Sequence, residues 1–376
     1  MLRKASLWTW GAVVCSAAGL LVLAAVLVAG CVMRTSSSSP IRMQVSDGHW
    51  VAQAPHGKLP GERYGYGGGY DPVGHQVVIY GDWSGGQDLG NYLAAYQTEQ
   101  NRWIEVSAKG GWPKKRDGAA VMFDPGDRRL IIFGGWDTDG NPLGDTWAYD
   151  LEGQRWSQLK PAGVQPQPRC AAGVAYDAQH GVGFLYGGTG EDARGDKEIL
   201  GDLWTYDARA NMWTELRPSG EIPSARGTTT MVFDSGASRL ILMFGIGPVG
   251  SGLLGDMWSY NIATNRWTQL SPKGDCPSPR VGSATAYCEA GNQIILFGGL
   301  DEIDDHNDTW MLDLGPDRWV RLPYEGGDVP TPRDGSVVFL DTDCQAVILF
   351  GGYGEHHDVL SDLWTYKLGD LANPTH

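Results

Sequence analysis

Short runs of apolar residues alternate with polar, glycine-rich turns along most of this chain, and one run recurs six times. In its clearest copy, residues 293–299 read Gln-Ile-Ile-Leu-Phe-Gly-Gly. The aromatic residues that end the six runs are separated by 53, 53, 58, 53 and 53 residues, and they are Tyr80, Phe133, Tyr186, Phe244, Phe297 and Phe350. A period near fifty predicts a solenoid or a propeller rather than separate domains. A run that is apolar on both faces predicts a buried strand, and the glycines after it predict a sharp turn of the backbone.

Three further strands are predicted around each apolar run. Residues 118–124 and the turn at 125–127 indicate a first strand that precedes the run. The loop after the run leads to a third strand that begins Asp-x-Trp, and a second tryptophan nine residues later predicts a hairpin to a fourth strand. Alternation along the third strand places Asp145, Trp147 and Tyr149 on one face. The first tryptophans are Trp147, Trp204, Trp258, Trp310 and Trp364.

An arginine precedes each run by a nearly constant interval, often in the context Pro-x-Pro-Arg. Proline cannot donate to a sheet ladder, so these segments are predicted to be linkers between sheets. Because residues that recur in every repeat serve a need that every repeat shares, we expect the arginines, aspartates and tryptophans to be structural. The arginines are Arg63, Arg116, Arg169, Arg226, Arg280 and Arg333.

Taken together, these features resemble the kelch repeat, over residues 46–368. The resemblance implies an all-β fold: a six-bladed kelch-type β-propeller with four antiparallel strands in each blade. Two repeats depart from the pattern, with Gly81-Asp82 in the first and Gly245-Ile246 in the fourth. The last repeat lacks a fourth strand, whereas Trp50 precedes Arg63 by the interval that separates Trp103 from Arg116. The N-terminal strand near Trp50 is therefore expected to close the last blade.

The first residues predict export or membrane attachment. Arg3 and Lys4 precede an uncharged stretch over residues 5–33, typical of a signal peptide or a membrane span. Residues 27–31 read Leu-Val-Ala-Gly-Cys and resemble the lipobox of bacterial lipoproteins, which implies a signal peptide over 1–30 and a lipid on Cys31. An uncleaved anchor is the alternative. Residues 31–45 are a serine-rich linker and residues 369–376 a tail, so we expect a lipid-anchored protein of the cell envelope, facing the periplasm or the exterior.

The net charge limits the classes of partner that the chain can bind, and the cysteine spacing limits the metal sites that it can form. A formal net charge of -15 argues against nucleic acid, whose phosphates require a basic surface, and fits cationic partners, divalent metals or neutral ligands. Four cysteines follow Cys31, and no Cys-x-x-Cys pair is present, so no zinc knuckle is indicated. Disulfides cannot be assigned from the spacing, and these four cysteines are Cys170, Cys276, Cys288 and Cys344.

The unrepeated loops between the second and third strands are the candidate functional site. Only unrepeated residues distinguish this propeller from another, and in the kelch family these loops share one face with the blade-to-blade linkers. The loop of the third repeat is longer, which suggests a specificity element or a lid. The candidate ligand-binding residues are Trp83, Trp136, Asp137, Asp139, Glu191, Asp192, Asp301, Asp304, Asp305, Tyr353 and Glu355.

Two subsets of these loops suggest a divalent cation such as calcium, and no other cofactor is expected. Asp137, Asp139 and Asn141 alternate as in a calcium loop, without the acidic residue that completes an EF-hand. A second subset could combine nitrogen and oxygen ligands from adjacent repeats. The alternative for both is that they are solvated loop tips. The second subset contains His306, His356, His357 and Asp358.

Two functions are compatible with these features. The first is a non-catalytic, membrane-tethered module that binds a protein or a glycan through the acidic loops. The alternative is a carbohydrate-active enzyme that resembles the sialic acid mutarotases, which are six-bladed kelch proteins of the periplasm. Galactose oxidase has a related propeller, but its copper ligands have no counterparts that can be mapped here. We assign no catalytic residue.

Overall fold

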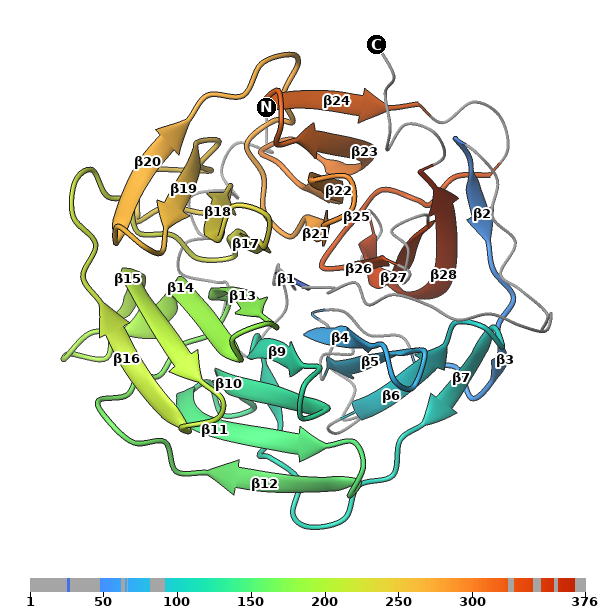
Figure 1. Cartoon of the computed structure of the whole chain (residues 1–376), viewed down its shortest axis with the longest axis horizontal. Helices are drawn as coiled ribbons and strands as arrows, with labels where there is room; N and C mark the ends of the chain where they lie inside the picture. Colours follow the sequence, from blue (N-terminus) through green and yellow to red (C-terminus); the bar gives the residue numbers. More distant parts are fainter. Residues whose placement is uncertain are drawn as a thin grey trace.

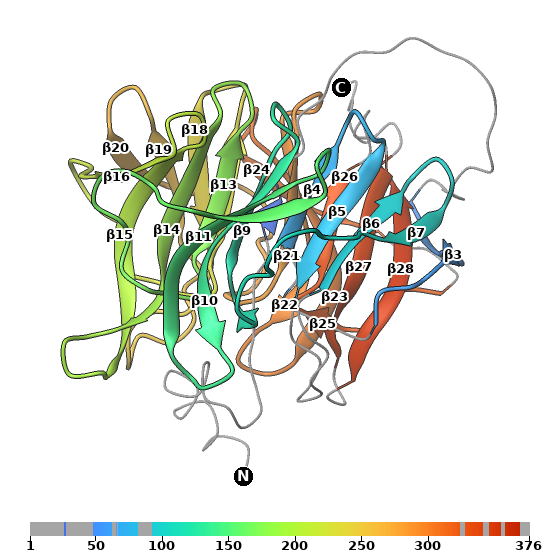
Figure 2. The same ribbon diagram turned by 90° about the horizontal axis from the view of Figure 1, so that it is seen from below.

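Six antiparallel sheets stand side by side around a central axis, as Figure 1 shows from above and Figure 2 from the side. The computed structural model describes residues 26–27, 48–61, 65, 67–81, 92–323, 328–340, 346–354 and 358–368. Within these residues the secondary structure consists of strands alone. The prediction of a six-bladed β-propeller with four antiparallel strands per blade is confirmed.

Each blade runs from an inner strand near the axis to an outer strand at the rim (Figure 1). The strands, from inner to outer, are β4 (Gly67–Asp71), β5 (Gln76–Gly81), β6 (Tyr92–Gln97) and β7 (Arg102–Glu105) in blade 1; β9 (Ala120–Asp124), β10 (Arg129–Asp137), β11 (Pro142–Asp150) and β12 (Arg155–Leu159) in blade 2; β13 (Gly173–Asp177), β14 (Val182–Glu191), β15 (Lys197–Asp207) and β16 (Met212–Leu216) in blade 3; β17 (Thr230–Asp234), β18 (Arg239–Met243), β19 (Met257–Asn261) and β20 (Arg266–Leu270) in blade 4; β21 (Ala284–Cys288), β22 (Gln293–Leu300), β23 (Asp305–Asp313) and β24 (Arg318–Leu322) in blade 5; and β26 (Val337–Leu340), β27 (Ala346–Gly354), β28 (Val359–Lys367) and β2 (Trp50–Ala52) in blade 6. Four two-residue strands join their edges or ends: β1 (Val26–Leu27), β3 (His56–Gly57), β8 (Arg116–Asp117) and β25 (Arg333–Asp334).

The N-terminal strand closes the ring, as the position of Trp50 predicted. β2 pairs with β28 in antiparallel register, with Trp50 opposite Tyr366. The ring of Trp50 also lies 5.2 Å from that of Phe297 in blade 5, so the N-terminal strand packs on the preceding blade as well. Because β2 supplies the outer strand of blade 6, this blade has four strands like the others and the ring is closed.

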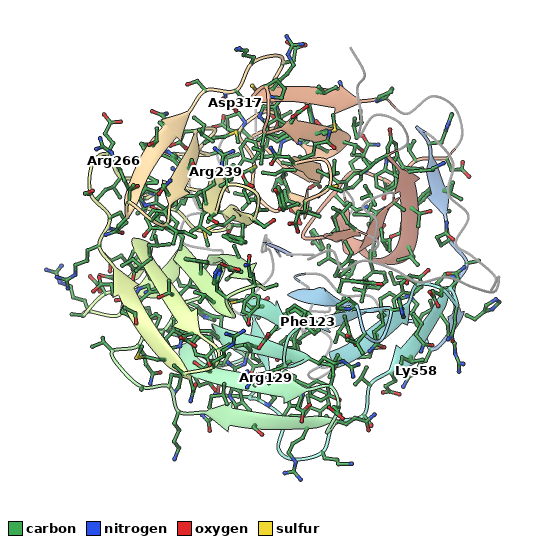
Figure 3. The ribbon with its side chains drawn as sticks, viewed as in Figure 1. Lys58, Phe123, Arg129, Arg239, Arg266 and Asp317 are labelled. Atoms are coloured by element: carbon green, nitrogen blue, oxygen red, sulfur yellow. The ribbon has the colours of Figure 1, made fainter. Side chains whose placement is uncertain are left out.

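Tryptophans fill the wedges between neighbouring blades. The fourth-strand tryptophan of a blade packs on the second-strand aromatic of the preceding blade, as Trp213 does on Phe133 with ring centroids 4.9 Å apart. Such pairs combine burial with favourable ring geometry. The equivalent pairs are Trp103 with Phe350, Trp156 with Tyr80, and Trp267 with Tyr186. The side chains that fill the sheets are drawn in Figure 3, where Phe123 lies close to the axis and Arg266 on the outer strand.

The repeated arginine joins three parts of each blade. Arg116 donates two hydrogen bonds to the carboxylate of Asp145, at 2.6 and 2.9 Å, and a third to the carbonyl of Gly134. The same carboxylate accepts the indole N–H of Trp147 at 2.6 Å. The other described arginines repeat this arrangement in the pairs Arg169–Asp202, Arg226–Asp256, Arg280–Asp308 and Arg333–Asp362. In blades 2 to 6 the repeated arginine, aspartate and tryptophan therefore contact one another within the frame of the blade.

These bonds also control the charge of the aspartates. Burial alone would raise the pKa of Asp202, but the hydrogen bonds from Arg169 and Trp204 outweigh it and lower the pKa below the ordinary value. The carboxylate therefore stays ionised, and the bidentate geometry fixes its orientation. The repeated ion pair is compensated inside the fold rather than offered to a ligand.

A second set of ion pairs, not foreseen from the sequence, lies at the ends of the inner strands. Asp71 at the end of β4 accepts two hydrogen bonds from Arg128 of blade 2. In blade 4, Asp234 pairs with Arg239 at 2.7 Å and also accepts the hydroxyl of Tyr287 from blade 5. The Asp71–Arg128 and Asp234–Tyr287 contacts join neighbouring blades and add to the stability of the ring.

The glycine pair is required by the approach of the next blade. Gly187 has a positive φ of 62°, and a Cβ on it would overlap the carbonyl oxygen of Arg226 in blade 4. In blade 4 the pair is shifted by one residue from the predicted Gly245-Ile246. Phe244 occupies the first glycine position with φ 58°, and its carbonyl accepts Arg226. The strand residue equivalent to Phe297 is thus Met243, and the predicted alignment of Phe244 with it was wrong.

Replacing Gly187 by alanine should destabilise the protein more than the same change at Gly195. Both glycines have positive φ, but the space around Gly195 is open. The difference isolates the steric overlap, which we expect to cost about 1–3 kcal/mol beyond the strain common to both positions. Chemical denaturation of the two variants measures it, and equal stabilities would contradict the proposed close approach.

Several sequence predictions fall outside the described residues. The signal segment, apart from Val26–Leu27, and Cys31 are among them, as are Arg63 and Cys344. No helix in the described part of the chain is long and apolar enough to cross a membrane. Of the cysteines that the structure describes, Cys170 and Cys288 are buried and Cys276 is exposed.

Candidate functional site

The loops between second and third strands lie on the same face of the ring as the linkers between blades. Lys114 in the linker from blade 1 to blade 2 bonds Asp137 in the loop of blade 2, and Ser278 in a later linker bonds Asp301 in the loop of blade 5. We call this surface the loop face. The remaining turns, such as those that contain Arg128 and Leu151, contact each other at the opposite ends of the strands, on a surface that we call the turn face.

In the loop of blade 2, the acidic side chains are held by the protein itself. The side chain of Asp137 is only 3% exposed and accepts Lys114 Nζ at 2.6 Å together with the backbone N–H groups of Asp139 and Asn141. Asp139, which is exposed, lies 3.3 Å from the same ammonium. The spacing suggested that Asp137 and Asp139 bind a calcium ion, whereas in the structure both carboxylates face the ammonium group of Lys114.

Trp136 lies beside this loop but is not open to a ligand. Its side chain is 4% exposed, and Lys197 Nζ lies 4.2 Å from the centre of the ring. Lys197 comes from β15 of blade 3, so the ring and the ammonium join neighbouring blades through a cation–π contact. The second predicted aromatic, Trp83, lies outside the described residues.

The longer loop of blade 3 is a continuation of its hairpin. β14 and β15 extend to 10 and 11 residues, and Glu191 pairs in register with Lys197 near the tip. At the tip, Asp192 accepts the backbone N–H groups of Arg194 and Asp196. Asp192 therefore stabilises the turn, and its charge remains exposed to solvent.

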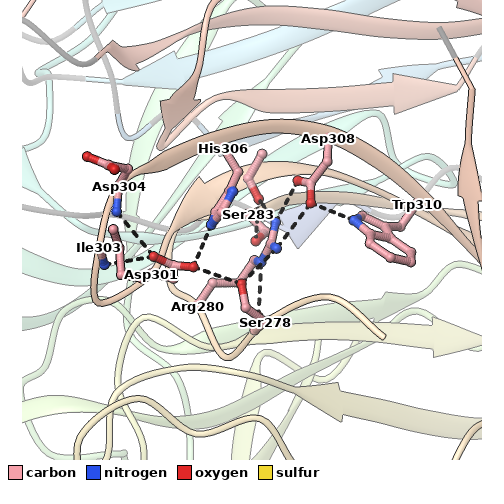
Figure 4. Close-up of polar contacts among 10 residues, drawn as sticks. Ser278, Arg280, Ser283, Asp301, Ile303, Asp304, His306, Asp308 and Trp310 are labelled. Carbon is pink, nitrogen blue, oxygen red and sulfur yellow. Dashed lines mark hydrogen bonds and ion pairs between the residues drawn. The ribbon is translucent and has the colours of Figure 1, made fainter. Parts of the chain in front are cut away.

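Asp301 organises the loop of blade 5 (Figure 4). One of its oxygens accepts the N–H groups of Ile303 and Asp304, and the other accepts Ser278 Oγ at 2.9 Å and lies 2.6 Å from His306 Nε2. Although partial burial acts to raise the pKa of Asp301, these hydrogen bonds lower it to about 2. Asp301 and His306 therefore fix the turn, and the exposed side chains at its tip are Glu302, Ile303 and Asp304.

Asp305, Asp334 and Tyr353 come together between blades 5 and 6. Asp334 lies opposite Tyr353 in the register of β25 with β27, and it is 2% exposed. Its Oδ1 has no hydrogen-bond partner. Burial, reinforced by the charge of Asp305, raises the pKa of Asp334 well above its ordinary value. Burial also raises the pKa of Tyr353, with further contributions from Asp334, Asp305 and Asp358.

Asp334 was missed at the sequence level, although a signal was present. It follows the repeated Arg333, at a position where blades 3, 4 and 5 carry Cys170, Gly227 and Val281. Blade 2 also carries an acid there, Asp117, so the signal is the change from uncharged residues in blades 3 to 5 back to an acid in blade 6. Only the structure shows that Asp334 is buried whereas Asp117 is half-buried.

Of the second predicted cation subset, the structure describes only His306 and Asp358. His306 faces Asp301, and Asp358 is exposed, with its carbonyl accepting the N–H of Gly354. Glu355, His356 and His357 lie outside the described residues. Within the residues that are described, no group of three or more His, Cys, Asp or Glu side chains is arranged to hold a metal ion, so the divalent cation stays a prediction.

Replacing Asp334 by asparagine should stabilise the protein at neutral pH. Because the pKa of Asp334 is higher in the folded state, its contribution to the free energy of unfolding falls as pH rises from the unfolded pKa to the folded pKa. Across that interval the slope is about 1.4 kcal/mol for each pH unit. The gain from Asp334→Asn should therefore be present at pH 7 and absent near pH 3, and urea denaturation at both pH values tests this. A less stable Asp334→Asn protein at pH 7 would show that the carboxylate is compensated.

Comparison with known proteins gives a family match over most of the chain. Residues 23–246 and 237–373 match the family described as the KLHDC2/KLHL20/DRC7 Kelch-repeats domain. The chain is 25% identical to Acyl-CoA-binding domain-containing protein 4 of Arabidopsis thaliana, over 82% of this chain and 46% of that protein. It is also 25% identical to Kelch domain-containing protein 3 of Homo sapiens, over 66% of this chain and 69% of that protein. This chain spans about half the length of the two Arabidopsis relatives that it matches, 46% and 47%.

Proposed function

Because this chain belongs to the kelch-repeat family, we propose that it is a non-catalytic module that binds a protein partner through its loop face. Kelch propellers commonly bind proteins, and the fold itself does not determine which surface is used. The proposal is supported by a difference between the repeated side chains and the side chains at the loop tips. The repeated arginines, aspartates and tryptophans bond one another inside the blades, whereas the exposed tips of the loop face differ from blade to blade.

The exposed tips have the composition of a protein-binding surface. Ile303 in blade 5 is 80% exposed and Val249 in blade 4 is 83% exposed. The two loops touch, since a Cβ on Gly252 would lie 3.6 Å from Glu302 Oε1. Exposed acids surround them, among them Glu302, Asp304 and Asp358. Apolar anchors within a charged rim are typical of protein interfaces.

We propose in addition that the propeller is tethered to a membrane through its N-terminal segment. The apolar stretch over residues 5–33 and Cys31 in its lipobox-like context support this. Metabolic labelling with a fatty acid tests it. The parent protein is expected to incorporate the label and Cys31→Ser is not, whereas membrane association without label in both would favour an uncleaved anchor.

The limited exposure of the predicted aromatic residues that are described favours a protein partner over a glycan. Sugar binding commonly uses an exposed ring, but Trp136 is covered by Lys197, and of the predicted aromatics only Tyr353 is described and partly exposed. A glycan ligand and the mutarotase-like activity stay predictions. A glycan array and a sugar mutarotation assay with the parent protein test them.

Affinity capture with matched variants tests the proposed face. The full chain in detergent is used to capture partners from extracts of cells that produce it. Ile303→Ser with Val249→Ser should abolish capture of a specific partner, whereas Val73→Ser, at a 64% exposed valine on the turn face, should not. Asp301 is left unchanged because it holds the turn. Capture that survives the double loop-face change but is lost in Val73→Ser would place binding on the turn face.

A further inference from the structure

The contact between blades 5 and 6 departs from the equivalent contacts elsewhere in the ring. Ile199, on the third strand of blade 3, faces Gly227, the residue that follows the repeated arginine of blade 4. A Cβ built on Gly227 would lie 3.6 Å from the side chain of Ile199. Between blades 4 and 5, the residues at the same two positions are Leu253 and Val281. Between blades 5 and 6 they are Asp305 and Asp334. Two acids therefore stand where the contacts into blades 4 and 5 have uncharged residues; blade 2 also has an acid after its arginine, Asp117, but Asp117 is half-buried whereas Asp334 is 2% exposed.

The packing of the blades gains nothing evident from the carboxyl group of Asp334. A buried carboxyl group without a full set of hydrogen bonds is unfavourable, and Oδ1 of Asp334 has no partner. The equivalent contacts with Gly227 and Val281 show that the repeat packs without an acid. A buried polar group that is costly and not needed for packing is a candidate for binding. Asp305 is partly exposed, so the candidate site formed by Asp305 and Asp334 extends to the loop face.

The charges around the pair determine the ligand that it suits. Asp304 and Asp358 are exposed on either side, in the loops of blades 5 and 6. Tyr353 lies beside the pair on β27. Ile303 is exposed at the tip of the loop that leads into Asp305. The surface thus combines negative charge with an aliphatic anchor, which is complementary to a positive and partly apolar ligand.

Building on the proposed function, we propose that the loop face binds a basic segment of its protein partner, with a lysine or arginine side chain placed between Asp305 and Asp334. An aliphatic residue of the same segment would pack on Ile303 and Val249. A cationic side chain can bond both carboxylates, and an arginine can do so through its planar fork. A metal ion is less suited, since the described residues provide no third acidic or histidine ligand.

Binding of a cation at this site should depend on pH. Without a ligand, burial and the charge of Asp305 raise the pKa of Asp334, so its carboxyl stays protonated to a higher pH than an exposed aspartate does. A bound cation displaces that proton, and affinity therefore rises with pH up to the pKa of Asp334. Tyr353 is a further titratable group beside the pair, and its own pKa is raised by burial and by Asp334, Asp305 and Asp358, while His306 faces Asp301. His356 and His357 follow β27 in the sequence and require their own control.

Selection of peptides on the full chain tests the proposal. Random dodecapeptides displayed on phage are selected on the protein in detergent, and the enriched sequences are synthesised. We expect an arginine or lysine next to an aliphatic residue, and loss of at least about tenfold in affinity when citrulline replaces the arginine or acetyl-lysine the lysine. Asp334→Asn and Asp305→Asn should weaken binding similarly, and Asp334→Asn should remove the rise of affinity with pH. Glu289→Gln on the turn face is the matched control.

The outcomes separate this proposal from the proposed function. Peptides without a cation, or an affinity unchanged by Asp334→Asn but lost in Ile303→Ser, would overturn the basic-segment proposal and leave the loop face in place. A pH dependence that persists in Asp334→Asn and disappears in His356→Gln/His357→Gln would also overturn it. Peptides that bind equally to all loop-face variants, or failure to select any peptide, would count against both proposals. Because Asp334→Asn is expected to be the more stable protein, a loss of binding cannot be ascribed to unfolding.

Discussion

Replacing Trp213 by alanine should lower the free energy of unfolding by about 3–5 kcal/mol. The side chain is 1% exposed and fills the wedge between blades 2 and 3, where it packs on Phe133 and donates its indole N–H to Thr146 at 3.2 Å. Truncation removes the ring from both blades and leaves a cavity that the sheets can only partly close. Chemical denaturation monitored by circular dichroism measures the change.

The neighbouring residue provides the control for Trp213. Met212 lies on the same strand, but its side chain is 39% exposed. Met212→Ala should change the free energy of unfolding by no more than about 0.5 kcal/mol, as expected for a surface position. If the two variants were equally stable, tryptophan packing between blades would not be what holds the ring together.

Replacing Arg226 by methionine should cost a similar amount, about 3–5 kcal/mol. Its side chain is fully buried and donates to both oxygens of Asp256 at 2.9 Å, to the carbonyl of Phe244 and to that of Ser224. Methionine leaves the carboxylate of Asp256 without its cation. Since Arg226 connects the linker, the second strand and the third strand, all three lose a common partner.

A double substitution shows whether the uncompensated charge is the cause. Arg226→Met combined with Asp256→Leu removes both charges, and it should recover a substantial part of the stability lost in Arg226→Met alone. Additive losses in the double variant would indicate that the two side chains act independently, contrary to the geometry. Urea denaturation of the parent, both single variants and the double variant completes the cycle.

The fold was predictable because the same contacts are made in each blade. Trp50 could be assigned to the last blade from its distance to Arg63 alone, since that interval reports a fixed path from an outer strand to the next linker. The alignment of blade 4 could not be predicted. Phe244 looks like the end of an apolar strand, and only its backbone angle shows that it occupies a glycine position.

The site was harder to predict because loop side chains depend on partners from other segments. Asp137 is turned inward by Lys114, which is 23 residues away in the chain. Trp136 is covered by Lys197 from the next blade. The acidic character of the loops and the place of Asp305 and Tyr353 could be predicted, whereas the burial of Asp334 depends on how blades 5 and 6 pack. Composition indicates the charge of such a surface, and packing decides which charges face outward.

Hydrogen–deuterium exchange shows whether a partner binds the loop face. The full chain is compared with and without a peptide selected on it. We expect slower exchange at residues 246–253, 301–306 and 333–334, with the turn-face segments 125–128 and 235–238 unchanged. Protection confined to those turn-face segments, or to outer strands such as β16 and β20, would contradict that expectation.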